Sequence, residues 1–82
     1  MYYFYVLKNN ENELYYGSTS DIKKRIFEHN NNRSISTKGK TWKLIYYEAY
    51  LFEDDARNRE HQIKHHGQAK RWLKERIKNS LK

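Results

Sequence analysis

Hydrophobic and aromatic residues gather in three runs that predict the strands of a small sheet. Residues 2–8 (YYFYVLK) combine aromatic side chains with a β-branched one, and residues 14–18 (LYYGS) resume this extended pattern after a polar turn. Residues 42–51 (WKLIYYEAYL) form the third run. The first two runs predict a β-hairpin, which would place Tyr5 and Tyr15 on neighbouring antiparallel strands.

Three further segments have the pattern of helices. Residues 22–30 predict a helix with Ser20 as its N-cap. Residues 52–65 predict a second helix, because the acidic residues of its first turn suit the positive end of the helix dipole and Gly67 breaks the pattern. Residues 69–81 predict a third helix, with leucine and isoleucine on one stripe and lysines on another.

The element order ββαβαα predicts an α+β fold, in which a three-stranded, mainly antiparallel sheet is flanked by helices. With 82 residues and no cysteine, we expect one small domain over residues 1–82 that folds without disulfides. The apolar runs are too short for a secretory signal or a membrane span, so we expect a cytoplasmic protein with no membrane partner. Residues 30–41 are too polar for a regular element, and such a long loop in a small domain is more often functional than idle.

The charge of the chain narrows the choice of partner. Seventeen Lys and Arg residues against ten Asp and Glu residues give a formal net charge of +7. For so small a domain this favours polyanions, of which nucleic acid is the foremost. The alternative interpretation is that basicity only aids solubility.

Two polar residues of the first predicted helix fall where apolar residues are expected. Ile22 and Ile26 define the face that would pack on the sheet, and His29 lies within about 20° of Ile22 on a helical wheel. Arg25 lies on the margin of the same face. Both polar side chains are therefore expected to point toward the tyrosines, although a hydrogen-bonded core histidine is the simpler interpretation of His29.

A glutamate of the second predicted helix has the same character. Phe52, Ala56 and Ile63 define the apolar side of this helix, and Glu60 lies only about 40° from Ala56. A carboxylate on that side needs a partner or a metal ion, since removing it from water alone costs on the order of several kcal/mol.

The convergence of these groups favours a catalytic role over a purely structural one. Taken singly, Glu60 could form a structural ion pair with Arg25 or Arg57. Together, two tyrosines, an arginine, a histidine and a glutamate suit hydrolysis of a phosphodiester, which needs a base for water, a divalent cation and positive charge for the developing phosphorane. A carboxylate is a suitable ligand for Mg²⁺ or Mn²⁺, and arginine matches phosphate oxygens. Tyrosine, with a pKa of about 10, needs a nearby cation to act as the base.

With this spacing the chain resembles the GIY-YIG nuclease superfamily, in particular its small, single-domain members of the excision-nuclease-like type. Residues 3–5 (YFY) stand in place of GIY and residues 15–17 (YYG) in place of YIG. Arg25 and His29 follow at the family's R-x-x-x-H spacing, and Glu60 matches its metal-binding glutamate. The glycine of GIY and the isoleucines of both elements are aromatic here, and the family's late asparagine is left unassigned, but the positions that would carry chemistry are kept.

The resemblance implies a metal-dependent endonuclease that cleaves DNA, with DNA repair as its setting. One tyrosine, Tyr5 or Tyr15, would accept the proton of the attacking water while the other orders that water. Arg25 would stabilise the transition-state phosphate, His29 would assist the water or phosphate network, and Glu60 would hold one Mg²⁺ or Mn²⁺ ion. The remaining tyrosines of the hairpin are expected to pack in the sheet.

Basic residues in two segments are candidates for contacts to the nucleic-acid backbone. They are Arg33, Lys38 and Lys40 in the long polar loop, and Arg71 and Lys74 on the third predicted helix. No zinc finger, recognition helix or stacking series is recognisable, so we expect little base-specific reading of branched or nicked DNA, with RNA as an alternative substrate. The protein is expected to act as a monomer or weak dimer.

Two other functions fit the same residues. A catalytically weak or inactive nucleic-acid-binding module on this scaffold is compatible with the altered GIY element. A structural adaptor that offers its aromatic surface to a protein partner is the third interpretation. The histidines His61, His65 and His66 are interpreted as an incidental surface cluster, because Glu60 provides the simpler metal hypothesis.

Overall fold

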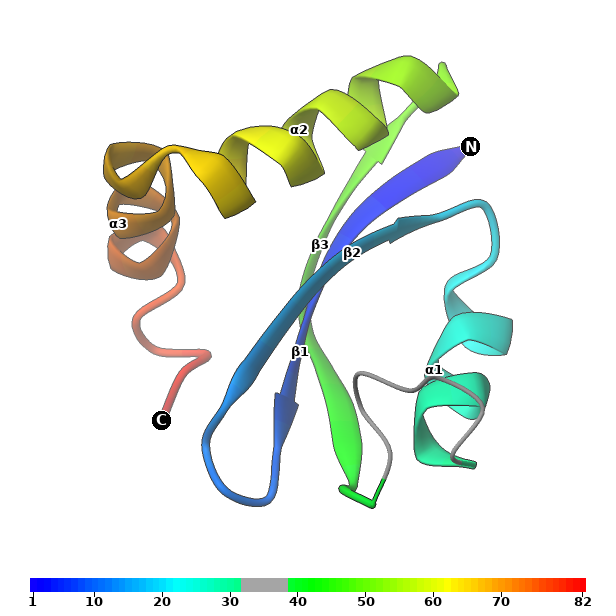
Figure 1. Ribbon diagram of the computed structural model, residues 1–82, viewed down its shortest axis with the longest axis vertical. Coiled ribbons are helices and arrows are strands. Elements are labelled where there is room, and N and C mark those ends of the chain that lie inside the picture. The colour runs from blue at the N-terminus through cyan, green and yellow to red at the C-terminus, as the bar shows by residue number, and fades with distance from the viewer. Residues whose placement is uncertain (32–38) are drawn as a thin grey trace.

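Strands and helices follow one another in the predicted order in the computed structural model, which describes residues 1–31 and 39–82 (Figure 1). The elements are β1 (Tyr2–Asn9), β2 (Leu14–Thr19), α1 (Ile22–Asn30), β3 (Trp42–Tyr50), α2 (Glu53–His65) and α3 (Gly67–Arg76). The predicted ββαβαα order is confirmed. None of these helices combines the length and the apolar character needed to cross a membrane.

The sheet has the strand order β2-β1-β3, and β1 pairs antiparallel with both neighbours. Tyr5 of β1 lies opposite Gly17 of β2 and Tyr47 of β3. The hairpin turn between β1 and β2 is fixed by Asn9, whose side-chain oxygen accepts hydrogen bonds from two backbone N–H groups of the turn, and by Asn12, which adopts the left-handed conformation (φ 64°). The predicted hairpin is therefore present, with asparagines in the roles that suit them.

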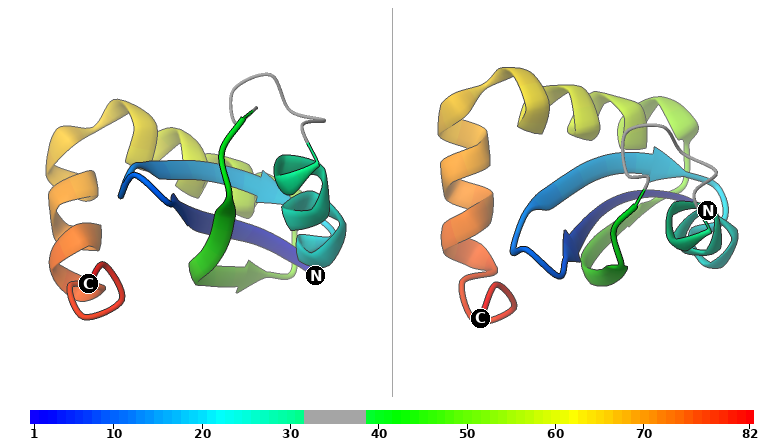
Figure 2. Two further views of the ribbon diagram at one scale, coloured as in Figure 1. Left: turned by 90° about the horizontal axis from the view of Figure 1, so that it is seen from below. Right: turned by 60° about the horizontal axis from the view of Figure 1, so that its bottom comes forward.

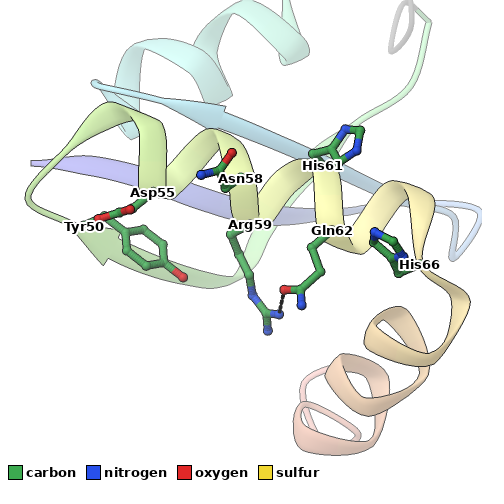
Figure 3. Close-up of a pocket in the computed structure, with 7 residues that line it drawn as sticks. All are labelled: Tyr50, Asp55, Asn58, Arg59, His61, Gln62 and His66. Carbon is green, nitrogen blue, oxygen red and sulfur yellow. Dashed lines mark hydrogen bonds between the residues drawn. The ribbon is translucent and has the colours of Figure 1, made fainter.

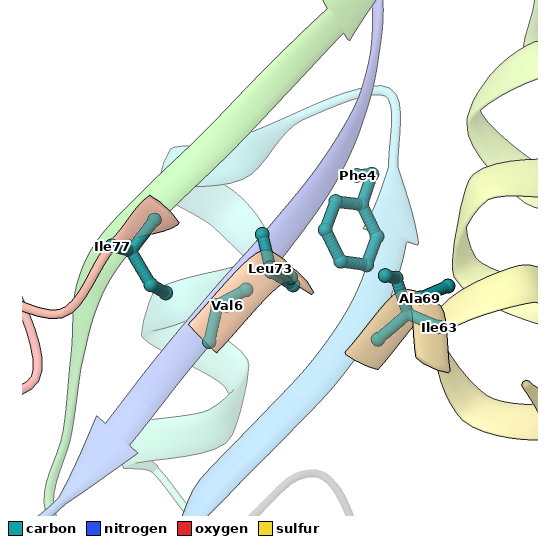
Figure 4. Close-up of a cluster of buried hydrophobic side chains, with 6 residues drawn as sticks. All are labelled: Phe4, Val6, Ile63, Ala69, Leu73 and Ile77. Atoms are coloured by element: carbon teal, nitrogen blue, oxygen red, sulfur yellow. The ribbon is translucent and has the colours of Figure 1, made fainter. Parts of the chain in front are cut away.

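Side chains of β1 alternate between two hydrophobic clusters, one on each face of the sheet. Phe4 and Val6 point to the face covered by α2 and α3, where they pack with the apolar residues shown in Figure 4: Ile63, Ala69, Leu73 and Ile77. Tyr5 and Leu7 point to the other face, where they pack with Trp42 and with Ile26 of α1. Figure 2 shows α1 at one end of the sheet, away from the corner formed by α2 and α3.

The N-cap of α1 differs from the prediction. Asp21, and not Ser20, is the N-cap, since its carboxylate accepts a 3.0 Å hydrogen bond from the backbone N–H of Lys24. Ser20 comes one residue too early to reach that N–H group. An ionised carboxylate also complements the helix dipole better than a hydroxyl.

The apolar side of the second helix was predicted to include Phe52, and this part of the prediction was wrong. Phe52 is 66% exposed and occupies the N-cap of α2 in an extended conformation, so it does not share the buried side of that helix. Ala56 and Ile63 are buried as predicted.

The boundaries of α3 also differ from the prediction. Gly67 is its first residue, because the chain leaves α2 at His66 and re-enters a helix at once. The helix ends at Arg76, where the prediction placed the end at residue 81. The following turn folds back onto β1, and the ammonium of Lys8 donates a 2.7 Å hydrogen bond to the carbonyl of Leu81. This tertiary contact, invisible to helical periodicity, competes with extension of the helix.

Candidate active site

The hydroxyl of Tyr5 is the centre of a partly buried hydrogen-bonded network. It lies 3.1 Å from Nε2 of His29 and 3.4 Å from Nε of Arg25, both on α1. A guanidinium can only donate, so the Tyr5 oxygen accepts from Arg25, and the tautomer of His29 sets which partner donates in the Tyr5–His29 hydrogen bond. The inward orientation predicted for these two α1 side chains thus produces direct contacts with a tyrosine of the sheet.

Gly17 makes room for this network. A Cβ atom built on Gly17 would lie 2.5 Å from the hydroxyl oxygen of Tyr5 and 2.6 Å from its Cζ. Any other residue would displace the phenol from the position in which it meets Arg25 and His29. The glycine that closes the YYG element is therefore explained by a close approach of side chain to backbone.

Tyr15 completes an aromatic wall beside the network. Its ring centroid lies 4.7 Å from that of His29 in an edge-on arrangement and 6.3 Å from that of Tyr5. The ring centroid of Trp42 lies 6.1 Å from that of Tyr15, also edge-on. The two tyrosines predicted to share one site are thus neighbours, with the imidazole in contact with both.

Burial shifts the pKa values of Tyr5 and His29 in opposite directions. Burial raises the pKa of Tyr5 to about 12, and the neighbouring Tyr15 and Glu60 add to this effect against the hydrogen bond from Arg25. Burial also lowers the pKa of His29, and the positive charge of Arg25 acts in the same direction. At neutral pH the site therefore holds a protonated Tyr5 phenol hydrogen-bonded to a neutral imidazole.

Glu60 comes from α2 and contacts the sheet at Ser18 of β2. Its Oε1 accepts a 2.6 Å hydrogen bond from the hydroxyl of Ser18, and its Oε2 accepts one of 2.7 Å from the ammonium of Lys64. The two arginines considered as its partners pair elsewhere, Arg25 with Glu28 and Arg57 with Glu53. Glu60 therefore forms its ion pair with Lys64, and the partners considered from the sequence, Arg25 and Arg57, were wrong.

Lys64 connects the carboxylate to the tyrosines. Its Nζ lies 5.7 Å from the ring centroid of Tyr15, in a cation–π contact. The spacing to Glu60 is one helical turn, so the i, i+4 rule could have identified this pair from the sequence. The other partner, Ser18, comes from a neighbouring strand and carries no such local signal.

A polar cavity of about 300 Å³ opens beside the network. Arg25 and Ser18 line it from one side and Arg57 and Glu53 of α2 from the other, with Tyr2, Thr19, Ser20 and Ala56 completing the wall. Two guanidinium groups thus face one cavity next to the buried phenol. Arg57 was considered only as an ion-pair partner on sequence grounds, and its position here makes it a further candidate for binding an anion.

A second cavity, of about 640 Å³, lies along α2 (Figure 3) and contains none of the candidate catalytic residues. Arg59, one of its lining residues, donates to Gln62 and to both oxygens of Glu48 on β3. Its role is to attach α2 to the sheet. The rings of His61 and His65 lie 4.3 Å apart between centroids, tilted by 33°, and both residues are exposed.

The donors around Glu60 fit a divalent cation held by a single protein carboxylate. Within residues 1–31 and 39–82 no three His, Cys, Asp or Glu side chains are grouped so as to hold a metal ion. An ion such as Mg²⁺ commonly binds through one or two carboxylates and completes its shell with water and substrate phosphate. Glu60, with the Ser18 hydroxyl against it, suits that kind of site and not an all-protein cage.

The candidate backbone-binding residues differ in their surroundings. Lys40 pairs with Glu11 at 3.1 Å and with Glu13, so its charge is partly engaged within the protein. Arg71 and Lys74 are exposed on α3. The predictions for Arg33 and Lys38 fall outside the described residues.

The fold and the site together define the class of protein: the chain belongs to the GIY-YIG family, whose catalytic-domain model matches residues 1–76. Domains of this family are typically nucleases, which act on nucleic acid and generally use divalent metal ions. The resemblance seen in the sequence is confirmed.

Relatives within this family are small UPF0213 proteins. That of Haloquadratum walsbyi is 32% identical over 72 residues, which cover 85% of this chain and 81% of the relative. That of Clostridium perfringens is 39% identical over 66 residues (78% and 71%), and that of Staphylococcus epidermidis 34% identical over 65 residues (77% and 79%). No solved structure gives a significant match.

Proposed function

We propose that this protein is a metal-dependent endonuclease that hydrolyses phosphodiester bonds in DNA, guided by the shape of the DNA with little sequence specificity. The observation that supports it most is the Tyr5–His29–Arg25 network, set between Tyr15 and the cavity lined by two guanidinium groups. A buried phenol and imidazole with shifted pKa values, next to a guanidinium that lines a polar cavity, are typical of a functional site.

The two tyrosines take different roles in this proposal. Tyr5 is fully buried and its pKa is raised to about 12, so its phenol stays protonated at neutral pH and is unsuited to act as the base. Tyr15 is only partly buried, and the ammonium of Lys64 lies 5.7 Å from its ring centroid, so this phenol is the more accessible of the two. We therefore assign Tyr15 as the base for the attacking water, and Tyr5, with His29, as the group that orders the water.

The phosphate is received by the guanidinium groups of the polar cavity. Arg25 is held by its contact with Tyr5, and its charge is maintained because that hydrogen bond raises its pKa further. A fixed guanidinium stabilises negative charge that develops on phosphate oxygens in the transition state. Arg57, on the opposite wall, provides a second contact to the same strand.

Glu60 is the residue that would hold a Mg²⁺ or Mn²⁺ ion. When bound, such an ion supplies positive charge to a non-bridging phosphate oxygen. Ser18 positions the carboxylate by its 2.6 Å hydrogen bond, so the ligand oxygen is oriented before the ion arrives.

The decisive experiment is cleavage of supercoiled plasmid and of branched, flapped and duplex DNA and RNA with Mg²⁺ or Mn²⁺. Glu60→Gln, which keeps an acceptor for Ser18, is expected to lower the cleavage rate about 100-fold or more. Glu75→Gln, on the exposed side of α3, is the matched control and should cleave at the wild-type rate. Full activity of the Glu60→Gln protein would rule out the metal assignment.

The alternative, a binding module without turnover, is favoured by one observation: the ammonium of Lys64 already neutralises Glu60. Salt-sensitive binding of branched DNA, with no cleavage in either metal by the wild-type protein, would establish this alternative in place of the nuclease.

A further inference from the structure

Both oxygens of the candidate metal ligand are already engaged by protein groups. Ser18 donates to one oxygen of Glu60, and Lys64, whose side chain is 39% exposed, approaches the other at 2.7 Å. The Glu60 side chain itself is only 24% exposed, so there is little room for solvent to take over these contacts. A cation that binds this carboxylate therefore meets a cation that is already there.

We propose that Lys64 is a built-in competitor of the divalent ion, which must release Glu60 before or as the ion binds. The inference rests on the proposed function, because that function makes Glu60 the metal ligand. A lysine ammonium is a compact point charge with three donors, and it meets the Oε2 oxygen of Glu60 as an ion would. A dication and an ammonium in contact with one carboxylate would lie a few ångströms apart, where their repulsion outweighs a shared ligand.

The structure also supplies a place for the released ammonium. The ammonium of Lys64 is carried on a flexible four-carbon side chain. The Tyr15 ring, 5.7 Å away, keeps this ammonium at the site when its contact to Glu60 breaks. The lysine would then lie beside the phenol assigned as the base. Release of Glu60 thus transfers positive charge toward Tyr15 without removing it from the site.

This competition has a direct consequence for the affinity of the metal. Removing the ammonium frees one carboxylate oxygen and removes a repulsion, so divalent ions should bind more tightly. A change to an uncharged side chain of similar length isolates this effect, whereas arginine keeps the charge.

The test is titration of the protein with Mn²⁺ alone, without nucleic acid, with the free ion followed by electron paramagnetic resonance. Lys64→Met is expected to lower the Mn²⁺ dissociation constant about threefold or more, since partly exposed ion pairs of this kind are modest in strength. Lys64→Arg should bind as the wild type does, and Glu60→Gln should lose the site. Lys64→Gln serves as a second neutral variant, with circular dichroism as the check of folding.

The possible outcomes separate the two proposals. Loss of the site in Glu60→Gln, with wild-type affinity in both neutral Lys64 variants, would overturn the competition and leave the metal ligand in place. Unchanged Mn²⁺ binding by Glu60→Gln would overturn the ligand assignment itself, and the competition with it. Tighter binding by both neutral variants, but not by Lys64→Arg, supports the competition.

Discussion

At the scale of single residues, the site depends on Gly17, which has no Cβ atom. The phenol of Tyr5 occupies the space where any side chain at position 17 would begin, and its contacts to Arg25 and His29 follow from that position. Tyr5 and Gly17 are direct partners across β1 and β2, so the register of the hairpin sets the position of the hydroxyl. A glycine that appears in the sequence only as part of a motif thus has a steric role.

Gly17→Ala is expected to destabilise the protein by about 1–3 kcal/mol and to abolish cleavage, because the new methyl group overlaps the Tyr5 ring. Urea unfolding measures the first effect and plasmid nicking the second. Gly67→Ala is the control, since a Cβ there meets nothing within 4 Å and alanine favours a helix. Equal stability of the two variants would contradict the steric explanation.

At the scale of elements, α2 is the helix that brings Glu60 to the sheet, and its attachment is polar as well as apolar. Glu48 of β3 accepts from both tyrosines that flank it, Tyr46 and Tyr50, and from two nitrogens of Arg59. Burial raises the pKa of Glu48, but these hydrogen bonds together lower it below its ordinary value. The carboxylate is therefore ionised and satisfied at neutral pH.

Arg59→Met is expected to lower the free energy of unfolding by about 1–3 kcal/mol, because it leaves the largely buried Glu48 without its cation. Arg57→Met is the matched control on the same helix. Its pair with Glu53 is exposed (67% and 50%), so the expected change is within about 0.5 kcal/mol. Urea unfolding measures the free energy of unfolding of both variants. A loss for Arg59→Met as small as that for Arg57→Met would show that α2 is held by packing alone.

The sequence predicted elements better than their ends. Alternating and helical patterns identified the three strands and three helices, because buried and exposed side chains recur along each element with the period of a strand or of a helix. Asp21 as N-cap and the early end of α3 depend on individual hydrogen bonds, the latter on Lys8, far away in the chain. Such contacts leave no periodic signal.

The candidate site was predictable to a similar extent. Arg25 and His29 stood out because they interrupt an apolar helical face, and the structure places both against Tyr5. Ser18 and Lys64 did not stand out, since a serine in a strand and a lysine on an exposed helix are ordinary. The contact of Ser18 to Glu60 depends on how α2 lies against β2, which is a tertiary property, whereas the Lys64–Glu60 pair follows from the i, i+4 spacing within α2.

At the scale of the whole molecule, the basic side chains that give the net charge of +7 differ in how freely they can contact DNA. Lys40 is engaged with Glu11 and Glu13, whereas Lys74 is exposed on α3. A charge already paired within the protein displaces fewer counterions when DNA binds. The two lysines should therefore contribute differently to the salt dependence of binding.

Lys74→Ala is expected to reduce the slope of log affinity against log salt by about one, as for the loss of one phosphate contact. Lys40→Ala should reduce it by less, because Lys40 must first release its two carboxylates. Fluorescence anisotropy of labelled duplex DNA between about 50 and 200 mM salt measures both slopes. A larger change for Lys40→Ala than for Lys74→Ala would contradict this ranking.

One eight-residue strand serves both faces of the molecule. Phe4 and Val6 belong to the cluster under α2 and α3, while Tyr5, between them, carries the network of the candidate site. The central amides of β1 should therefore exchange with deuterium only when the whole molecule opens. Loss of the candidate site on heating and global melting would then be one event, and this fold would have no partly open state in which the pocket is lost but the core survives.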